Sequence, residues 1–127
     1  MKLRIKGNSL RLRVTRSELA RLSAGERVKE SIRFTPEPEG VLCYALASDP
    51  ASDGLHVRYS PGEIAVIVSN DQMRSLSDES QVGIYATLHP REAEELQISI
   101  EKDLACLDGS DADNRDTFTN PSEGKSC

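Results

Sequence analysis

The sequence contains no tryptophan, and its two phenylalanines and three tyrosines make up only 4% of the residues. A core built from this chain must therefore be mainly aliphatic. Proteins that bind single-stranded nucleic acid commonly stack the bases on aromatic side chains. The shortage of aromatic residues argues against that function, and so does the net charge of −5.

The chain also lacks long apolar segments and closely spaced cysteines. No run of about eighteen apolar residues is present, so the sequence predicts no membrane-spanning helix. The first fourteen residues alternate charged and apolar side chains, unlike the continuous apolar core of a signal peptide. Cys43, Cys106 and Cys127 are odd in number and far apart, which argues against a disulfide framework. We therefore expect a cytoplasmic protein.

What the chain does contain is a repeat with a period of 54 residues. Shifting the sequence by this distance places apolar residues on apolar residues, as with Leu12 on Val66 and Leu46 on Ile100. The repeat predicts a single domain over residues 1–107. Repeat 1 covers residues 1–47, a connector covers 48–54, and repeat 2 covers 55–103.

Each repeat has the pattern of a ββαββ unit. Alternating residues on both sides of a two-residue Gly7-Asn8 link predict a β-hairpin. A capping box at residues 15–18, repeated at 69–72, predicts a short helix, and Gly25 is placed to end the first one. Two strands follow, and His89-Pro90 is expected to end the third strand of repeat 2.

These units predict an α+β fold with two short helices. We expect the two tandem ββαββ repeats to form a bent, antiparallel-rich sheet or a partly closed barrel, with an open stack of two sheets as the alternative. The outer face of the second hairpin carries Ala65 and Ile67, which need a cover: the helices, residues 104–107, or a second subunit in a homodimer. Residues 108–127 are acidic and nearly devoid of apolar side chains, which predicts a flexible tail.

Charge is distributed unevenly along the chain. Residues 1–47 carry ten basic and five acidic residues, whereas residues 48–127 carry six basic and sixteen acidic residues. The polar face of the first hairpin gathers five cations and no acid: Lys2, Arg4, Lys6, Arg11 and Arg13. This face is the best candidate for contact with an acidic protein or a small anionic ligand. The acidic tail is a competitor for the same surface. We interpret the chain as a non-enzymatic binding domain of otherwise unknown function.

Three acidic residues are the basis of an alternative interpretation, in which the protein is an enzyme. Glu30 falls on an otherwise apolar strand face, where it either guards a sheet edge or acts as a perturbed acid or base. Glu101 and Asp103 share one face at a strand end, where they either form ordinary ion pairs or hold a divalent ion. In the second case the protein would act on a small phosphorylated molecule.

No cofactor or metal site is predicted. A zinc site needs four closely spaced ligands, which three scattered cysteines and two histidines do not supply. The acidic run at Asp111 and Asp113 departs from the EF-hand pattern at its later positions. Cys106 would need His56 or His89 within hydrogen-bond reach to act as a nucleophile.

Two end motifs give the chain a resemblance. The opening Lys6-Gly7-Asn8-Ser9 and the closing Glu101-Lys102-Asp103 with Cys106-Leu107 resemble those of a small uncharacterised bacterial family. The resemblance covers nearly the whole chain. It implies a bacterial protein and no known activity, cofactor or partner.

Overall fold

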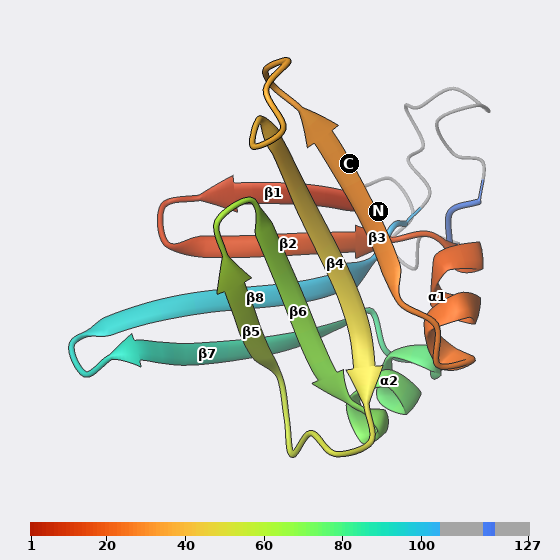
Figure 1. The fold of residues 1–127 in the computed structure, drawn as a ribbon. Coiled ribbons are helices and arrows are strands. Elements are labelled where there is room, and N and C mark those ends of the chain that lie inside the picture. The colour runs from red at the N-terminus through yellow and green to blue at the C-terminus, as the bar shows by residue number, and fades with distance from the viewer. Residues whose placement is uncertain (105–115, 119–127) are drawn as a thin grey trace.

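The computed structural model describes residues 1–104 and 116–118 (Figure 1). Eight strands and two helices follow one another in the order ββαββ-ββαββ, which confirms the α+β class and the two similar halves. The elements are β1 (Lys2–Lys6), β2 (Ser9–Val14), α1 (Arg16–Ser23), β3 (Val28–Arg33), β4 (Val41–Asp49), β5 (His56–Ser60), β6 (Glu63–Ser69), α2 (Asn70–Ser77), β7 (Gly83–Arg91) and β8 (Glu94–Lys102).

The strands form two four-stranded sheets, and each sheet takes one hairpin from each repeat. Sheet A has the order β1-β2-β8-β7 and sheet B the order β3-β4-β6-β5. The hairpins are antiparallel, whereas the two central pairs, β2 with β8 and β4 with β6, are parallel. Ser9 lies opposite Gln97 in sheet A, and the equivalent positions Glu63 and Cys43 lie opposite one another in sheet B. Each sheet thus pairs a hairpin of repeat 1 with a hairpin of repeat 2, an arrangement that we call an exchange of hairpins. The two central pairings have the same register.

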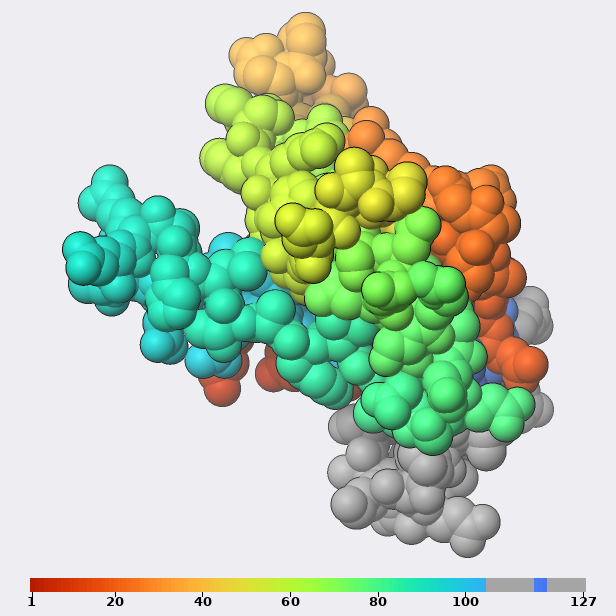
Figure 2. Space-filling model, turned by 90° about the horizontal axis from the view of Figure 1, so that it is seen from below, coloured from red at the N-terminus to blue at the C-terminus, as the bar shows by residue number. Residues whose placement is uncertain are grey.

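The two sheets stack as separate layers and, within the described residues, do not close into a barrel. This is the open stack that the sequence left as the alternative. The sheets cross one another, so that the β3–β4 and β7–β8 hairpin tips project beyond the opposite sheet (Figure 1). The projecting β7–β8 tip is also plain in the space-filling view (Figure 2).

The core between the sheets is aliphatic, as the composition predicted. Leu12, Val14 and Ile100 from sheet A meet Leu46 and Val66 from sheet B within a single cluster, and each is almost completely buried. Burying an aliphatic side chain of this size contributes about 1.5–3 kcal/mol.

The helices lie together at one end of the stack (Figure 1). Both capping boxes are present: the Thr15 hydroxyl accepts from the Glu18 amide, and the Ser69 hydroxyl from the Gln72 amide. Gly25 follows α1 with φ +89°, a conformation that glycine adopts without steric cost. The hydroxyls of Ser23 and Ser77, one repeat period apart in sequence, lie 2.8 Å from each other. At this contact, equivalent residues of the two repeats meet each other.

Two local expectations need correction. Strand β7 does not end at His89-Pro90 but continues to Arg91 through an irregularity between Leu88 and Arg91. Because β7 is an edge strand, the missing N–H of Pro90 removes no hydrogen bond from the centre of the sheet.

The second correction concerns Ala65 and Ile67, which belong to β6 in sheet B. No described helix or strand lies over the outer face of this sheet (Figure 1). Both are nevertheless buried together with Ala45. Longer side chains stand opposite two of these residues: Lys29 opposite Ala45, and Arg58 opposite Ala65. These small residues are therefore already buried in a single chain, and a homodimer over this face stays a prediction.

Most of the predicted acidic tail, including Asp111, Asp113 and Cys127, lies outside the described residues, and so does Cys106. The three described residues of this region, Asp116 to Phe118, make specific contacts. The Asp116 carboxylate accepts from the amide and the hydroxyl of Ser17, and the Phe118 amide donates to the Asp103 carbonyl oxygen over 2.9 Å. Within the described part of the chain, no helix combines the length and apolar character needed to cross a membrane.

Candidate functional site

The outer face of sheet A carries the polar side chains of four strands in cross-strand rows. In one row Arg4 lies opposite Arg11, Arg11 opposite Ser99, and Ser99 opposite Tyr85. The next row contains Lys6, Ser9, Gln97 and Thr87. Because β2 pairs with β8, the basic hairpin of repeat 1 is continued by the last hairpin of repeat 2.

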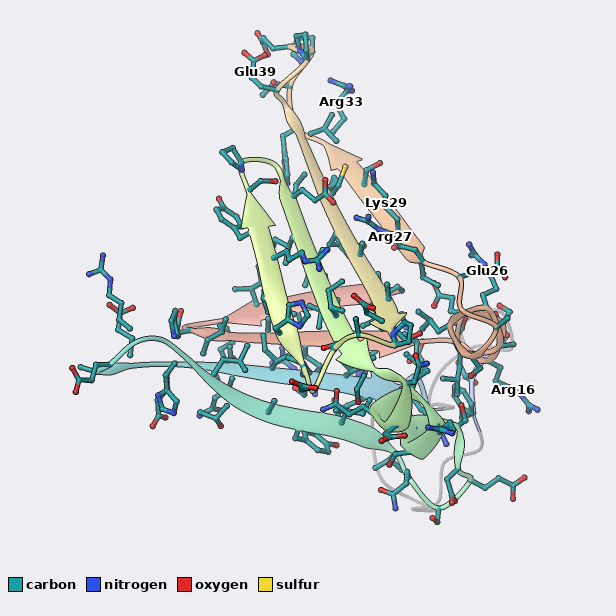
Figure 3. The ribbon with its side chains drawn as sticks, turned by 60° about the horizontal axis from the view of Figure 1, so that its bottom comes forward. Arg16, Glu26, Arg27, Lys29, Arg33 and Glu39 are labelled. Carbon is teal, nitrogen blue, oxygen red and sulfur yellow. The ribbon has the colours of Figure 1, made fainter. Side chains whose placement is uncertain are left out.

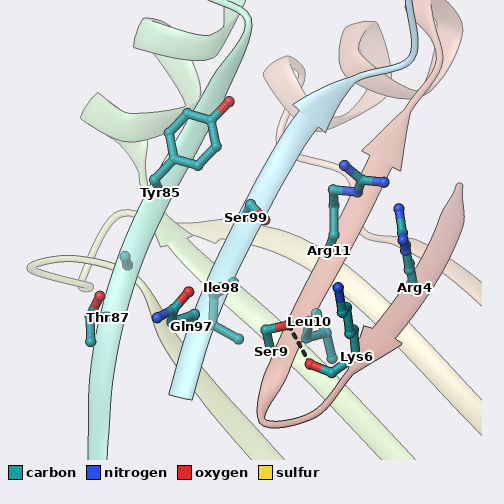
Figure 4. Close-up of a pocket in the computed structure, with 11 residues that line it drawn as sticks. Arg4, Lys6, Ser9, Leu10, Arg11, Tyr85, Thr87, Gln97, Ile98 and Ser99 are labelled. Atoms are coloured by element: carbon teal, nitrogen blue, oxygen red, sulfur yellow. Dashed lines mark hydrogen bonds between the residues drawn. The ribbon is translucent and has the colours of Figure 1, made fainter. Parts of the chain in front are cut away.

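These two rows line a hollow of about 460 Å³ on the outer face of sheet A (Figure 4). Arg4, Lys6 and Arg11 stand on one side of the hollow, and Tyr85 and Thr87 on the other. Gln97 and Ser99 lie between them, and the Ser9 hydroxyl donates to the Lys6 carbonyl oxygen over 2.6 Å. Sequence reasoning found the cations but missed the side chains of β7 and β8, because nothing local indicates which hairpin pairs with β2.

The five predicted cations do not share one environment. Lys2 forms an ion pair with Asp103 at 3.1 Å, and Arg11 forms one with Glu101 at 3.4 Å. Within the described residues, Arg4, Lys6 and Arg13 have no acidic partner. The outer face of sheet A therefore keeps an excess of positive charge, concentrated at the β1–β2 end.

Glu101 contacts a residue from each side of the hollow: Arg11 on the cationic side and Tyr85 on the aromatic side. One carboxylate oxygen accepts a hydrogen bond of 2.9 Å from the Tyr85 hydroxyl. The other oxygen is buried without a hydrogen bond, and its nearest described cation is the Arg11 guanidinium. Burial raises the pKa of Tyr85, the hydrogen bond to Glu101 adds to this, and the charge of Arg11 opposes it. Tyr85 thus stays a protonated donor at neutral pH.

Gly83 makes room for the Tyr85 side chain. A Cβ atom at position 83 would lie 2.7 Å from the Tyr85 hydroxyl and 2.9 Å from the Ile100 carbonyl oxygen, closer than such atoms approach. The tyrosine side chain therefore runs along β7 over Gly83 toward Glu101, and 61% of Tyr85 remains exposed.

The acids singled out for catalysis are engaged elsewhere. Glu101 and Asp103 lie on the same face, but each faces a different cation, and Asp103 is buried. No group of three or more histidine, cysteine, aspartate or glutamate side chains suited to a metal is present in residues 1–104 and 116–118. The structure thus gives no specific support to a divalent ion held by this pair.

Glu30 binds the α-amino group of Met1. Its carboxylate accepts from this ammonium group at 3.0 Å and from the Tyr44 hydroxyl at 2.8 Å, while Glu18 holds the same ammonium group from the other side. Burial lowers the pKa of the amine, but the two carboxylates outweigh this effect and raise it. Glu30 therefore stabilises a partly buried positive charge, and Tyr44 completes the hydrogen bonding around it.

Sheet B shows what the same backbone looks like without these polar groups. At the positions equivalent to Arg11, Ser99 and Glu101, its outer face has Ala65, Ala45 and Ala47. Three of its cations, Arg27, Lys29 and Arg33, lie along the edge strand β3 and the residues just before it (Figure 3), and Arg27 is paired with Glu63. A fourth, Arg58, lies on the other edge strand, β5. The backbone fold therefore does not require a polar hollow. The hollow in sheet A depends on the particular side chains that this sheet carries.

The structure thus defines a two-layer α+β domain with exchanged hairpins and a polar hollow on one outer face. A family model described as "Family of unknown function (DUF7009)" matches residues 1–122. The chain belongs to this family, as its end motifs suggested. No curated protein and no solved structure is significantly similar to the chain.

Proposed function

We propose that the protein is a non-enzymatic binding domain, and that the outer face of sheet A binds a small ligand with a phosphate-like anionic group. The observation that carries this proposal is the position of Arg4 and Lys6. Both line the hollow beside Arg11, and neither has an acidic partner within the described residues. Clustered cations without counter-charges attract an anion, and charge-assisted hydrogen bonds to phosphate are strong.

The shape and lining of the hollow support a small ligand. Its volume of about 460 Å³ falls within the range of ordinary small-molecule sites. Serine and threonine hydroxyls and the Gln97 amide supply further hydrogen bonds, and among the described residues the lining contains no histidine, cysteine, aspartate or glutamate. We include in the proposal the bacterial origin that the family resemblance implies and the cytoplasmic location that the sequence predicts.

The test is calorimetric titration of the full chain with pyrophosphate in a metal-free buffer. A charge-assisted hydrogen bond contributes about 1.5–3 kcal/mol. The double variant Arg4→Gln with Lys6→Gln should therefore bind at least about 10-fold more weakly, since 1.4 kcal/mol is tenfold. Binding to the unmodified chain should also weaken as salt is added, because exposed charges are screened.

Arg58→Gln is the matched control. Arg58 occupies the position equivalent to Arg4 in the first hairpin of repeat 2, is also exposed, and lies on sheet B. This variant should bind pyrophosphate as the unmodified chain does. The proposal is wrong if pyrophosphate does not bind, or if the control loses as much affinity as the double variant.

A further inference from the structure

The hollow has different chemistry at its two ends. Arg4 and Tyr85 occupy the ends of one row that crosses all four strands of sheet A. Neighbouring strands lie about 4.8 Å apart, so the backbones at the two ends are separated by roughly 14 Å. A ligand held by the cations at one end therefore extends toward an aromatic ring at the other.

The aromatic end is built to hold its ring in place. The Tyr85 hydroxyl is bound by Glu101, and the absence of a side chain at Gly83 lets the tyrosine run along the strand. Tyr85 still exposes 61% of its surface. At the equivalent positions of sheet B, Lys29 and Ser31 replace Gly83 and Tyr85, so the sheet itself does not demand a ring.

The middle of the hollow is polar and small. Ser99 and Gln97 lie between the two ends and offer a hydroxyl and an amide, which both donate and accept hydrogen bonds. These groups fit a neutral polar spacer.

We infer that the ligand is a nucleotide, with its phosphates at Arg4, Lys6 and Arg11 and its base stacked on Tyr85. A nucleoside diphosphate has phosphates, a hydroxylated sugar and a flat base in the same order as the hollow has cations, polar groups and an aromatic ring. This inference rests on the proposed function, because it adds a second contact to the same anion-binding site. It concerns a free nucleotide and not a nucleic-acid chain.

The test compares ADP with pyrophosphate on the full chain in metal-free buffer. Both compounds carry a diphosphate, so the difference between their affinities isolates the nucleoside. Stacking of a base on an aromatic side chain is expected to make ADP bind about 5- to 100-fold more tightly than pyrophosphate.

Three variants locate the stacking contact. Tyr85→Leu should abolish the preference for ADP and leave pyrophosphate affinity unchanged, whereas Tyr85→Phe should keep most of the preference because the ring remains. Tyr59→Leu is the control, since Tyr59 is 74% exposed but lies on β5 in sheet B. It should bind both compounds as the unmodified chain does.

The outcomes separate this inference from the proposed function. If pyrophosphate binds and ADP binds no more tightly, the nucleotide inference is overturned and the anion site stands. If neither compound binds, both proposals fail. The inference also fails if Tyr85→Leu keeps the preference, or if a single-stranded oligonucleotide binds far more tightly than ADP.

Discussion

Replacing Gly83 with alanine should destabilise the protein, although glycine-to-alanine changes in strands usually do the opposite. The backbone at Gly83 does not adopt a positive φ, so alanine would not be strained there. Such a replacement ordinarily stabilises a protein by about 0.4–1 kcal/mol through the unfolded chain. Here the new Cβ would lie 2.9 Å from the Ile100 carbonyl oxygen and 2.7 Å from the Tyr85 hydroxyl, so atoms must move.

The size of the effect follows from what has to move. Ile100 belongs to β8, which pairs with β7, so its backbone cannot retreat without disturbing that pairing. Overpacking of this kind costs about 1–3 kcal/mol, and displacing Tyr85 also weakens its hydrogen bond to Glu101. We expect a net loss of about 1–2 kcal/mol in the free energy of unfolding, measured by urea denaturation. Each kcal/mol should lower Tm by about 4 °C in a chain of 127 residues, because the entropy of unfolding is about 2.1 cal/mol/K per residue.

Gly54→Ala provides the control, because no atom lies within 4 Å of the Cβ it would add. It should leave stability unchanged or raise it slightly. In a Tyr85→Ser background, Gly83→Ala should cost less, because the clash with the ring is gone and only the contact with Ile100 remains. A Gly83→Ala protein as stable as the unmodified chain would refute the close approach of Tyr85 to Gly83.

Two further predictions concern the hydrogen bonds around the Met1 amine. Burial raises the pKa of Glu18, but its hydrogen bonds to this amine and to Thr15 have the larger effect, so the pKa is lowered from 4.5. Glu18 therefore stabilises the fold above about pH 4.5, and this stabilisation is lost as the pH falls through the lowered pKa. Glu18→Gln should therefore lower the free energy of unfolding at pH 7, and urea denaturation at pH 3 should show a smaller difference. Burial and the hydrogen bond to Glu30 raise the pKa of Tyr44 to about 12. Phenol absorbance should therefore show a tyrosine that titrates near pH 12 and that Tyr44→Phe removes. The same variant should cost about 1–2 kcal/mol in unfolding experiments, and an unchanged stability would count against the hydrogen bond to Glu30.

The elements of the fold were predictable because their signals are local. The Gly7-Asn8 link, the capping boxes and the alternating apolar residues each depend on a few neighbours in sequence, and the structure has a hairpin, two helices and strands at these places. Pro90 was misread because a proline ends a central strand but is tolerated on an edge, and edge position is a property of the assembled sheet.

The candidate site was predictable only on its cationic side. Alternation placed Arg4, Lys6 and Arg11 on one face, but it could not show that β8 would pair with β2 and bring Ser99 beside Arg11. Likewise, Glu30 looked like a misfit on its strand because its partner, the Met1 amine, approaches from another part of the chain. Both the β2–β8 pairing and the contact of Glu30 with the Met1 amine join residues far apart in sequence. The residues next to them in sequence therefore do not predict either contact.

The exchange of hairpins sets an order of events when the chain is made. The parallel partner of β2 is the last strand, so sheet A cannot form its centre until residues up to Lys102 have been synthesised. Until then β1 and β2 form a two-stranded hairpin, which is marginally stable by itself. Sheet B needs only residues up to Ser69, so it has all its strands first. A chain stopped between these two points holds one complete sheet and an unpaired strand edge, which is the form most exposed to association with its own copies.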